Sequence, residues 1–253
     1  MIKYGLKLWS VNKKYFLDVI DFYHTGLIDF AELYIVPNTF RKREAAILKN
    51  IPVQIHAPHS LHSFNVFGLD KEKIDLFKNQ VVEAADFFDS QHIILHSGVG
   101  SDLKIFKRNI KKISDKRILV ENKPKIGLDN RICFGYSLSQ LRFIKKKCKL
   151  SICLDISHAI KSALSQKKDY KKYLETLIKT LEPDYFHVSD GLLIGEEDEH
   201  LSLGKGDFDL KWIKNILNKL SKTKDISIVI ETPKGKDNLE NDAKNINFFK
   251  NKI

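Results

Sequence analysis

Histidine, aspartate and glutamate side chains recur at or just beyond the ends of short apolar runs in this chain. His56 closes one run in HAPHS (56–60), and Glu121 closes another in ILVENKP (118–124). The full set is His56, His96, Glu121, Asp155, His158, His187, Asp198, His200 and Glu231. A single histidine of this kind is more often a hydrogen-bonded structural residue than a ligand, so the argument depends on the whole set.

Gathering these side chains at one place would be costly, because carboxylates repel one another and lose their hydration. Divalent cations remove that cost, and a mixture of imidazole and carboxylate suits zinc, manganese or iron better than calcium or magnesium. Zinc takes about four ligands, so nine candidates are too many for one ion. The set therefore predicts a cluster of about two or three ions, a type of centre that acts on phosphoesters.

The elements that must position these residues are short runs rich in Ile, Val, Leu and Phe, which predict buried parallel strands. The eight runs span residues 4–10, 30–37, 51–58, 92–98, 117–124, 150–157, 184–190 and 226–233. Amphipathic stretches such as 71–88 and 210–220 lie between them, and a last helical stretch is predicted over 237–252.

Eight strand-then-helix units in a chain of 253 residues are typical of an α/β fold, the (β/α)8 TIM barrel, which we predict as a single domain over residues 1–253. A doubly wound open sheet is the rival, but it usually has fewer strands and a Gly-rich first turn. The first turn here, residues 9–12, contains no glycine. In a TIM barrel the carboxyl ends of the strands meet at one mouth, so the predicted ligands would converge there.

The motifs around these residues resemble those of the endonuclease IV family, within the wider superfamily of xylose isomerase-like barrels. The likeness runs from HAPHS (56–60) to IVIETP (228–233), and His200 to Gly206 matches the family's His-x-x-x-Gly-x-Gly. It implies three zinc ions held by the nine residues of the set. It also implies a hydrolase that cleaves the phosphodiester of DNA at abasic sites with a metal-activated water.

The same resemblance implies roles for individual residues. Glu121 and Glu231 would bridge metals, orient the nucleophile and assist proton transfer. Lys123 and Lys205 would neutralise substrate phosphates. The family usually carries a Tyr-Leu pair just beyond its first ligand motif, which helps to open the DNA, whereas His59 and Ser60 stand there in this chain. That exchange removes an apolar wedge, although His59 is still expected to be close enough to touch the substrate.

A metal-dependent sugar or sugar-phosphate isomerase or epimerase is the alternative. That branch of the superfamily holds one or two metals with a Glu/Asp/His/Glu set, which Glu121, Asp155, His187 and Glu231 match equally well. Glu121 and Glu231 would then serve as an acid/base pair beside the carbonyl of a small sugar. A non-catalytic metal-binding protein is a third class, which so many open-type ligands disfavour.

Composition sets the remaining expectations. The net charge is +11 at pH 7, which suits a polyanion such as nucleic acid but also suits a Lys-rich proteome. The 3 cysteines give no disulfide framework, and the N-terminus MIKYGLKLWS has no signal-peptide core, so a cytoplasmic location is expected. The longest apolar runs have the length of strands, and we predict no membrane association.

Overall fold

The computed structural model describes residues 1–127, 130–235 and 238–253. Its eight strands form a closed parallel barrel in which each strand pairs with its neighbours in the sequence and β8 pairs with β1. The strands are β1 (Ile2–Trp9), β2 (Phe30–Tyr34), β3 (Val53–His56), β4 (Ile93–His96), β5 (Ile118–Glu121), β6 (Ser151–Asp155), β7 (Tyr185–Val188) and β8 (Ile226–Ile230). Each lies within or overlaps its predicted run, and the predicted TIM barrel is confirmed.

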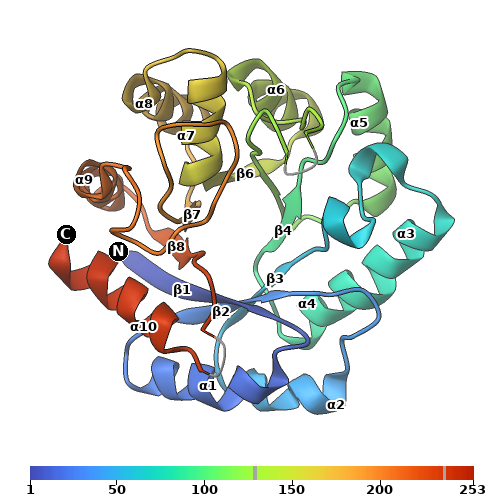
Figure 1. Ribbon diagram of the computed structural model, residues 1–253. Coiled ribbons are helices and arrows are strands. Elements are labelled where there is room, and N and C mark those ends of the chain that lie inside the picture. The colour runs from blue at the N-terminus through green and yellow to red at the C-terminus, as the bar shows by residue number, and fades with distance from the viewer. Residues whose placement is uncertain (128–129, 236–237) are drawn as a thin grey trace.

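Helices surround the barrel, as Figure 1 shows. They are α1 (Phe16–His24), α2 (Lys42–Ala45), α3 (Lys71–Leu76), α4 (Glu83–Phe87), α5 (Leu103–Ile110), α6 (Leu138–Phe143), α7 (Ile156–Ser165), α8 (Tyr170–Leu181), α9 (Leu210–Ser221) and α10 (Glu240–Asn247). A π-helical segment, Phe77–Val82, joins α3 to α4, so the predicted helical stretch 71–88 is nearly continuous. The predicted stretch 237–252 corresponds to α10 and a π-helical turn, Phe248–Lys252; its first position, 237, lies outside the described residues.

Local sequence fixes where several helices begin. Asp70, Asp102, Asp155, Asp169 and Asp209 each precede a helix and accept hydrogen bonds from backbone N–H groups of its first turn. Aspartate favours this position because its side chain satisfies donors that have no partner inside the helix. The side chain of Asp155 thus starts α7 directly after β6, which keeps this connection short at the end of the barrel where the strands terminate.

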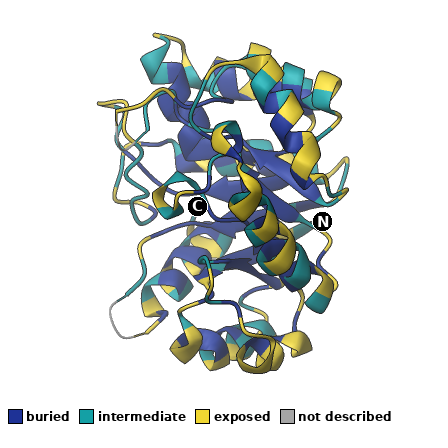
Figure 2. Ribbon diagram, turned by 90° about the vertical axis from the view of Figure 1, so that its right-hand side faces the viewer, coloured by how far each residue is buried: buried dark blue, intermediate teal, exposed yellow. Residues whose placement is uncertain are grey.

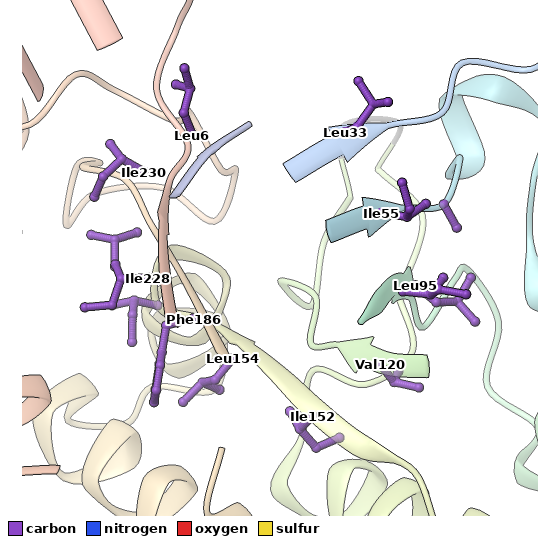
Figure 3. Close-up of a cluster of buried hydrophobic side chains, with 14 of the residues drawn as sticks. Leu6, Leu33, Ile55, Leu95, Val120, Ile152, Leu154, Phe186, Ile228 and Ile230 are labelled. Carbon is purple, nitrogen blue, oxygen red and sulfur yellow. The ribbon is translucent and has the colours of Figure 1, made fainter. Parts of the chain in front are cut away.

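Alternation along the strands sorts the side chains into two sets. The outward set packs beneath the helices and is apolar, as in Leu33, Ile55, Leu95 and Phe186. Figure 3 shows these side chains pointing away from the barrel axis. Figure 2 shows the strands as the buried interior and the helices with exposed outer faces. Burial of the strands on both faces explains why their sequences read as nearly continuous apolar runs.

The inward set forms layers inside the barrel. The lower layer is apolar and consists of Phe30, Ile94, Leu119, Cys153, Tyr185 and Val229. Gly5 of β1 completes it, because a Cβ atom there would lie 2.4 Å from the Phe30 ring. Two residues further along each strand the inward side chains become ionisable, and this upper layer opens at the carboxyl ends of the strands. Within the described part of the chain, no helix is long and apolar enough to span a bilayer.

Candidate metal centre

The upper layer of the barrel brings all the predicted strand-end ligands together. His56 ends β3, His96 ends β4, Glu121 ends β5 and Asp155 ends β6. His187 lies on β7, and Glu231 directly follows β8. These side chains point to one axis because they occupy equivalent inward positions on neighbouring strands, as the pairings His96↔Glu121 and Asp155↔His187 show.

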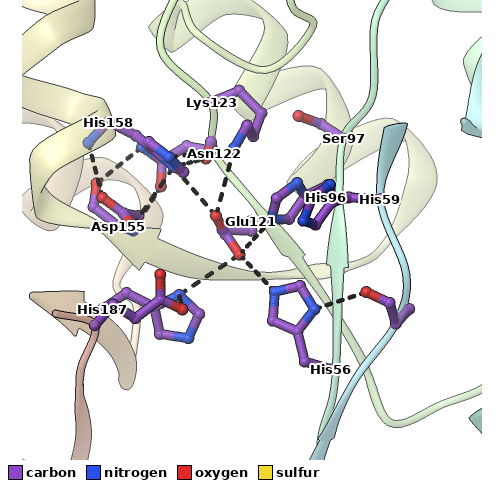
Figure 4. Close-up of polar contacts among 12 residues, drawn as sticks. His56, His59, His96, Ser97, Glu121, Asn122, Lys123, Asp155, His158 and His187 are labelled. Atoms are coloured by element: carbon purple, nitrogen blue, oxygen red, sulfur yellow. Dashed lines mark hydrogen bonds and ion pairs between the residues drawn. The ribbon is translucent and has the colours of Figure 1, made fainter. Parts of the chain in front are cut away.

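Glu121 lies at the centre of the cluster and is about 1% exposed. Its Oε2 lies 3.2 Å from Nε2 of His56 and 3.2 Å from Nε2 of His96. Its Oε1 lies 3.1 Å from Nδ1 of His158, so the two oxygens face different groups of histidines (Figure 4). This carboxylate is therefore placed to serve two neighbouring cation positions.

Asp155 and His158 form one unit because Asp155 caps the helix on which His158 lies. Asp155 Oδ1 accepts a hydrogen bond of 2.7 Å from the His158 backbone N–H, and Asp155 Oδ2 lies 3.6 Å from His158 Nδ1. His158 Nε2 lies 3.0 Å from Asp198 Oδ2, and His200 Nε2 lies 2.5 Å from the same oxygen. The spacing Asp-x-x-His thus arises from a helix cap that turns both side chains to the mouth.

His187 connects this cluster to Glu231. Its Nδ1 lies 3.1 Å from Glu231 Oε1 and 3.5 Å from Glu121 Oε2. The second oxygen of Glu231 faces His200, with Oε2 and Nδ1 3.8 Å apart. The nine predicted ligands therefore form one continuous network across the barrel mouth.

The loop that carries Asp198 and His200 is held by Asp190. The Asp190 carboxylate accepts hydrogen bonds from the backbone N–H groups of Gly191, Gly204, Gly206 and Phe208, at 2.9, 2.8, 2.9 and 3.3 Å. Asp190 and Leu201 also exchange two backbone hydrogen bonds. The glycines of the predicted Gly-x-Gly stretch are explained by this packing, since a Cβ on Gly206 would lie 2.4 Å from the Gly191 carbonyl oxygen.

The residues present fit divalent cations. Three groups of ligand atoms in the predicted set lie within 4.8 Å of one another: His56, His96 and Glu121; Asp155, His158 and His200; and Glu121, Asp155 and His187. Buried atoms in the cluster, including Glu121 Oε1, His187 Nδ1 and His200 Nε2, lie 2.5–3.1 Å from ionisable neighbours but make no well-aligned hydrogen bond with a described residue. Unsatisfied buried polar atoms are costly, and bound cations would satisfy them.

The electrostatics of the cluster agree with this fit. Burial raises the pKa of Glu121, but His96, His158 and His56 outweigh burial and hold its pKa well below its usual range. Burial lowers the pKa of His158, yet the carboxylates of Asp155 and Asp198 raise it to about 10. Without cations, the cluster therefore binds protons to balance its carboxylates.

Above the ligands is a cavity of about 630 Å³. Of the predicted substrate-binding residues, His59 and Lys123 line it, whereas Lys205 is exposed on a turn and is not among the lining residues that the structure describes. Lys123 Nζ lies 3.2 Å from His158 Nε2 and 4.0 Å from Glu121 Oε1. The His59 ring stacks on His96 with centroids 4.7 Å apart, and burial, together with the charge of Lys123, lowers the pKa of His59 to about 2.

Two exposed apolar side chains also line this cavity. Trp9 is 44% exposed at the end of β1, and Leu61 is 66% exposed in the short 3-10 turn Ser60–His62. Leu61 lies one residue beyond the His59–Ser60 pair that replaces the family's Tyr-Leu pair. The barrel mouth therefore has exposed apolar surface next to His59 and Ser60, which stand where the family has its Tyr-Leu pair.

Sequence reasoning missed two residues of the upper layer, the partly buried Lys7 of β1 and the buried Glu32 of β2. Lys7 Nζ contacts Glu231 Oε1 and lies 3.6 Å from Glu32 Oε1. Glu32 Oε2 lies 3.0 Å from His187 Nε2. Alternation of side chains along a strand could have indicated both residues, because Lys7 is two residues after Gly5 and Glu32 is two residues after Phe30, on the same face of their strands.

Comparison with known proteins agrees with the fold. Residues 19–252 match the family model of the xylose isomerase-like TIM barrel, and the chain belongs to that family. The probable endonuclease 4 of Campylobacter concisus (strain 13826) is 23% identical to it in an alignment of 203 residues, with a coverage of 69% of this chain and 69% of that one.

Solved structures of two kinds of enzyme share the fold. Endonuclease IV from Thermus thermophilus superimposes with a TM-score of 0.72 and 21% identity, covering 98% of this chain and 97% of that one. A D-tagatose 3-epimerase-like protein also gives a TM-score of 0.72, with 20% identity and coverage of 98% and 96%. The fold is thus common to endonucleases and sugar epimerases, so the choice of reaction depends on the site.

Proposed function

We propose that this protein is a metal-dependent phosphoester hydrolase that cleaves DNA at abasic sites. The observation that carries the proposal is the extent of the ligand network. His56 and His96 on one side of Glu121, and His158, Asp198 and His200 on the other, extend beyond the four-residue set that a sugar epimerase needs. Zinc is the expected metal, with two or three ions, and manganese or iron would suit the same ligands.

Such ions, when bound, supply Lewis-acid stabilisation of a phosphoryl group and an activated water. Side chains of this protein would orient the water and hold the ions. Burial raises the pKa of Glu231, but His187 and then Lys7 outweigh burial and hold it well below its usual range. Glu231 is therefore ionised at the cavity surface, where it can orient a water by accepting a hydrogen bond from it. Glu121 would help to hold the ions, since its two oxygens face histidines on different sides.

The cavity walls suit an anionic substrate with an apolar face. Lys7 and Lys123 line the cavity on opposite sides of the ligand network and supply positive charge near a bound phosphate. Trp9 and Leu61 supply exposed apolar surface at the rim, of a kind that can contact unstacked bases. The net charge of +11 favours association with a polyanion.

A sugar or sugar-phosphate epimerase is the second candidate, supported by one feature of the geometry. Glu121 and Glu231 both approach Nδ1 of His187, at 3.5 and 3.1 Å, so two carboxylates flank a single cation position. Paired carboxylates of this type can remove a proton and return it on either side of a metal-bound carbonyl. A metal content near three ions per chain would support the hydrolase, and a content near one or two would support the epimerase.

The test is cleavage of a short duplex with a single abasic site by zinc- or manganese-loaded protein. We expect nicking that is abolished in Glu231→Gln and retained in Asp115→Asn, a variant of an ion pair with Arg117 outside the ligand network. Intact duplex after incubation with folded, metal-loaded protein would refute the DNA assignment. Turnover of a ketose or aldose by the same preparation would establish the epimerase.

A further inference from the structure

Glu32 is fully buried on β2 and is not among the nine ligands predicted from the sequence, although its carboxylate, His187 and Glu231 offer ligand atoms that lie within 4.8 Å of one another. Its Oε2 accepts one hydrogen bond from the Tyr185 hydroxyl, at 2.7 Å, and a second from His187 Nε2, at 3.0 Å. These partners come from β7, which is far from β2 in the sequence. A buried carboxylate is costly unless it is paired, so a position that keeps one inside the barrel calls for an explanation.

The contact with Glu32 distinguishes the two nitrogens of His187. An ionised carboxylate can only accept hydrogen bonds, so Nε2 carries the proton that it donates to Glu32. The other nitrogen, Nδ1, faces Glu231 Oε1 and Glu121 Oε2 and has no hydrogen-bond partner in the described part of the chain. Nδ1 is therefore the nitrogen presented to the cation positions.

Lys7 balances the charge that Glu32 adds. Its ammonium group contacts Glu231 Oε1 and lies 3.6 Å from Glu32 Oε1, and its side chain is only 13% exposed. The pair of Glu32 and Lys7 is neutral as a whole, so it orients His187 without adding net negative charge to the ligand network. Because Lys7 occupies Oε1 of Glu231, it also leaves Oε2 of that carboxylate turned to His200.

We propose that Glu32 is a positioning residue of the metal centre, which holds His187 as the Nε2–H tautomer and so directs Nδ1 to a metal. The inference rests on the metal centre of the proposed function, whether the substrate is DNA or a sugar. Carboxylates that accept a hydrogen bond from a metal-bound histidine fix its orientation and raise its basicity. Loss of such a partner typically lowers metal affinity about 10- to 100-fold.

The experiment measures zinc affinity and ion count by competition with a chromogenic chelator, for wild type, Glu32→Gln and the control Asp115→Asn. Glutamine keeps the size of the side chain but loses its charge. We expect Glu32→Gln to weaken one ion about 10- to 100-fold and to leave the others unchanged, and Asp115→Asn to behave as wild type. Spectra of 15N-histidine-labelled, zinc-loaded protein should show an Nε2–H tautomer for His187, and its Nε2–H proton should exchange faster with water in Glu32→Gln because a neutral acceptor makes a weaker hydrogen bond.

Tyr185→Phe provides a second, milder variant if Glu32→Gln folds poorly. Glu32 then keeps one of its two hydrogen bonds, and we expect the same ion to be weakened about three- to tenfold. Unchanged zinc affinity and unchanged exchange of the His187 Nε2–H proton in both variants would overturn the role of Glu32 while leaving the metal centre in place. A wild-type protein that binds no divalent metal would instead overturn the proposed function, and this inference with it.

Discussion

Asp190 offers the sharpest test of how the loop with Asp198 and His200 is held at the barrel mouth. Its carboxylate accepts four backbone N–H hydrogen bonds, two in buried and two in partly buried surroundings. In Asp190→Ala the buried donors lose their partner at a cost of about 1–3 kcal/mol each, and the others lose about 0.5–1.5 kcal/mol each. The sum is about 3–9 kcal/mol.

This loss exceeds the free energy that normally holds a surface loop to its domain, so we expect local detachment of the loop rather than unfolding of the barrel. Trypsin cleavage after Lys205, which lies within the loop, reports the detachment. A loss of about 3 kcal/mol corresponds to roughly a 100-fold higher population of the open loop and a similar rise in cleavage rate. The variant should also bind fewer metal ions, because Asp198 and His200 leave the network.

Asp207→Asn is the matched control, since Asp207 is exposed in the same loop and its carboxylate accepts, among the described residues, one hydrogen bond, from Leu193 N at 3.2 Å. We expect the control to be cleaved at nearly the wild-type rate. If Asp190→Ala resists trypsin as well as wild type and keeps the full complement of metal, the reasoning about Asp190 is wrong.

Three further outcomes are expected. Lys7→Met removes the ammonium group that Glu231 and Glu32 share and should lower the free energy of unfolding of the metal-free protein by about 3–5 kcal/mol, measured in urea; an unchanged midpoint would contradict the ion pairing. Removal of zinc with a chelator should lower stability by about 2.7 kcal/mol relative to zinc at 100 times its dissociation constant; equal melting curves with and without chelator would argue against binding. The Arg117 guanidinium, through its hydrogen bond, holds the pKa of Asp115 below its usual range. This pair therefore stabilises the protein above about pH 4, and the stabilisation is lost as the pH falls through the pKa of Asp115 in the folded state. An Asp115→Asn variant that stays less stable than wild type at low pH by the same amount would refute this.

Much of the fold could be predicted because parallel barrel strands leave a clear signature. Each strand is buried on both faces, so its sequence is an apolar run, and each run is followed by a helical stretch. The ligands were predicted for a related reason: a His, Asp or Glu that ends such a run must lie at the common mouth. His56, His96, Glu121 and Asp155 all end their strands in the structure.

Glu32 and Lys7 escaped prediction because they lie within their runs rather than at the ends. The run around Glu32 extends to residue 37, but β2 ends at Tyr34. A single charged residue within an apolar run does not by itself indicate a functional site, because the side chains that it faces are known only once the register of the barrel is known. The pairing Lys7↔Glu32 and the contact between Glu32 and His187 place Glu32 in the ionisable layer.

The sequence by itself therefore determined the eight strand–helix units and the residue types at the barrel mouth, because both follow from local periodicity. Only the tertiary structure decided which atoms face one another. It turned Nδ1 of His187 to Glu231 and Nε2 to Glu32, and it brought Asp190 to the backbone of the loop that carries His200. These contacts join residues from separate strands and loops, so they depend on barrel closure and register, which no local pattern encodes.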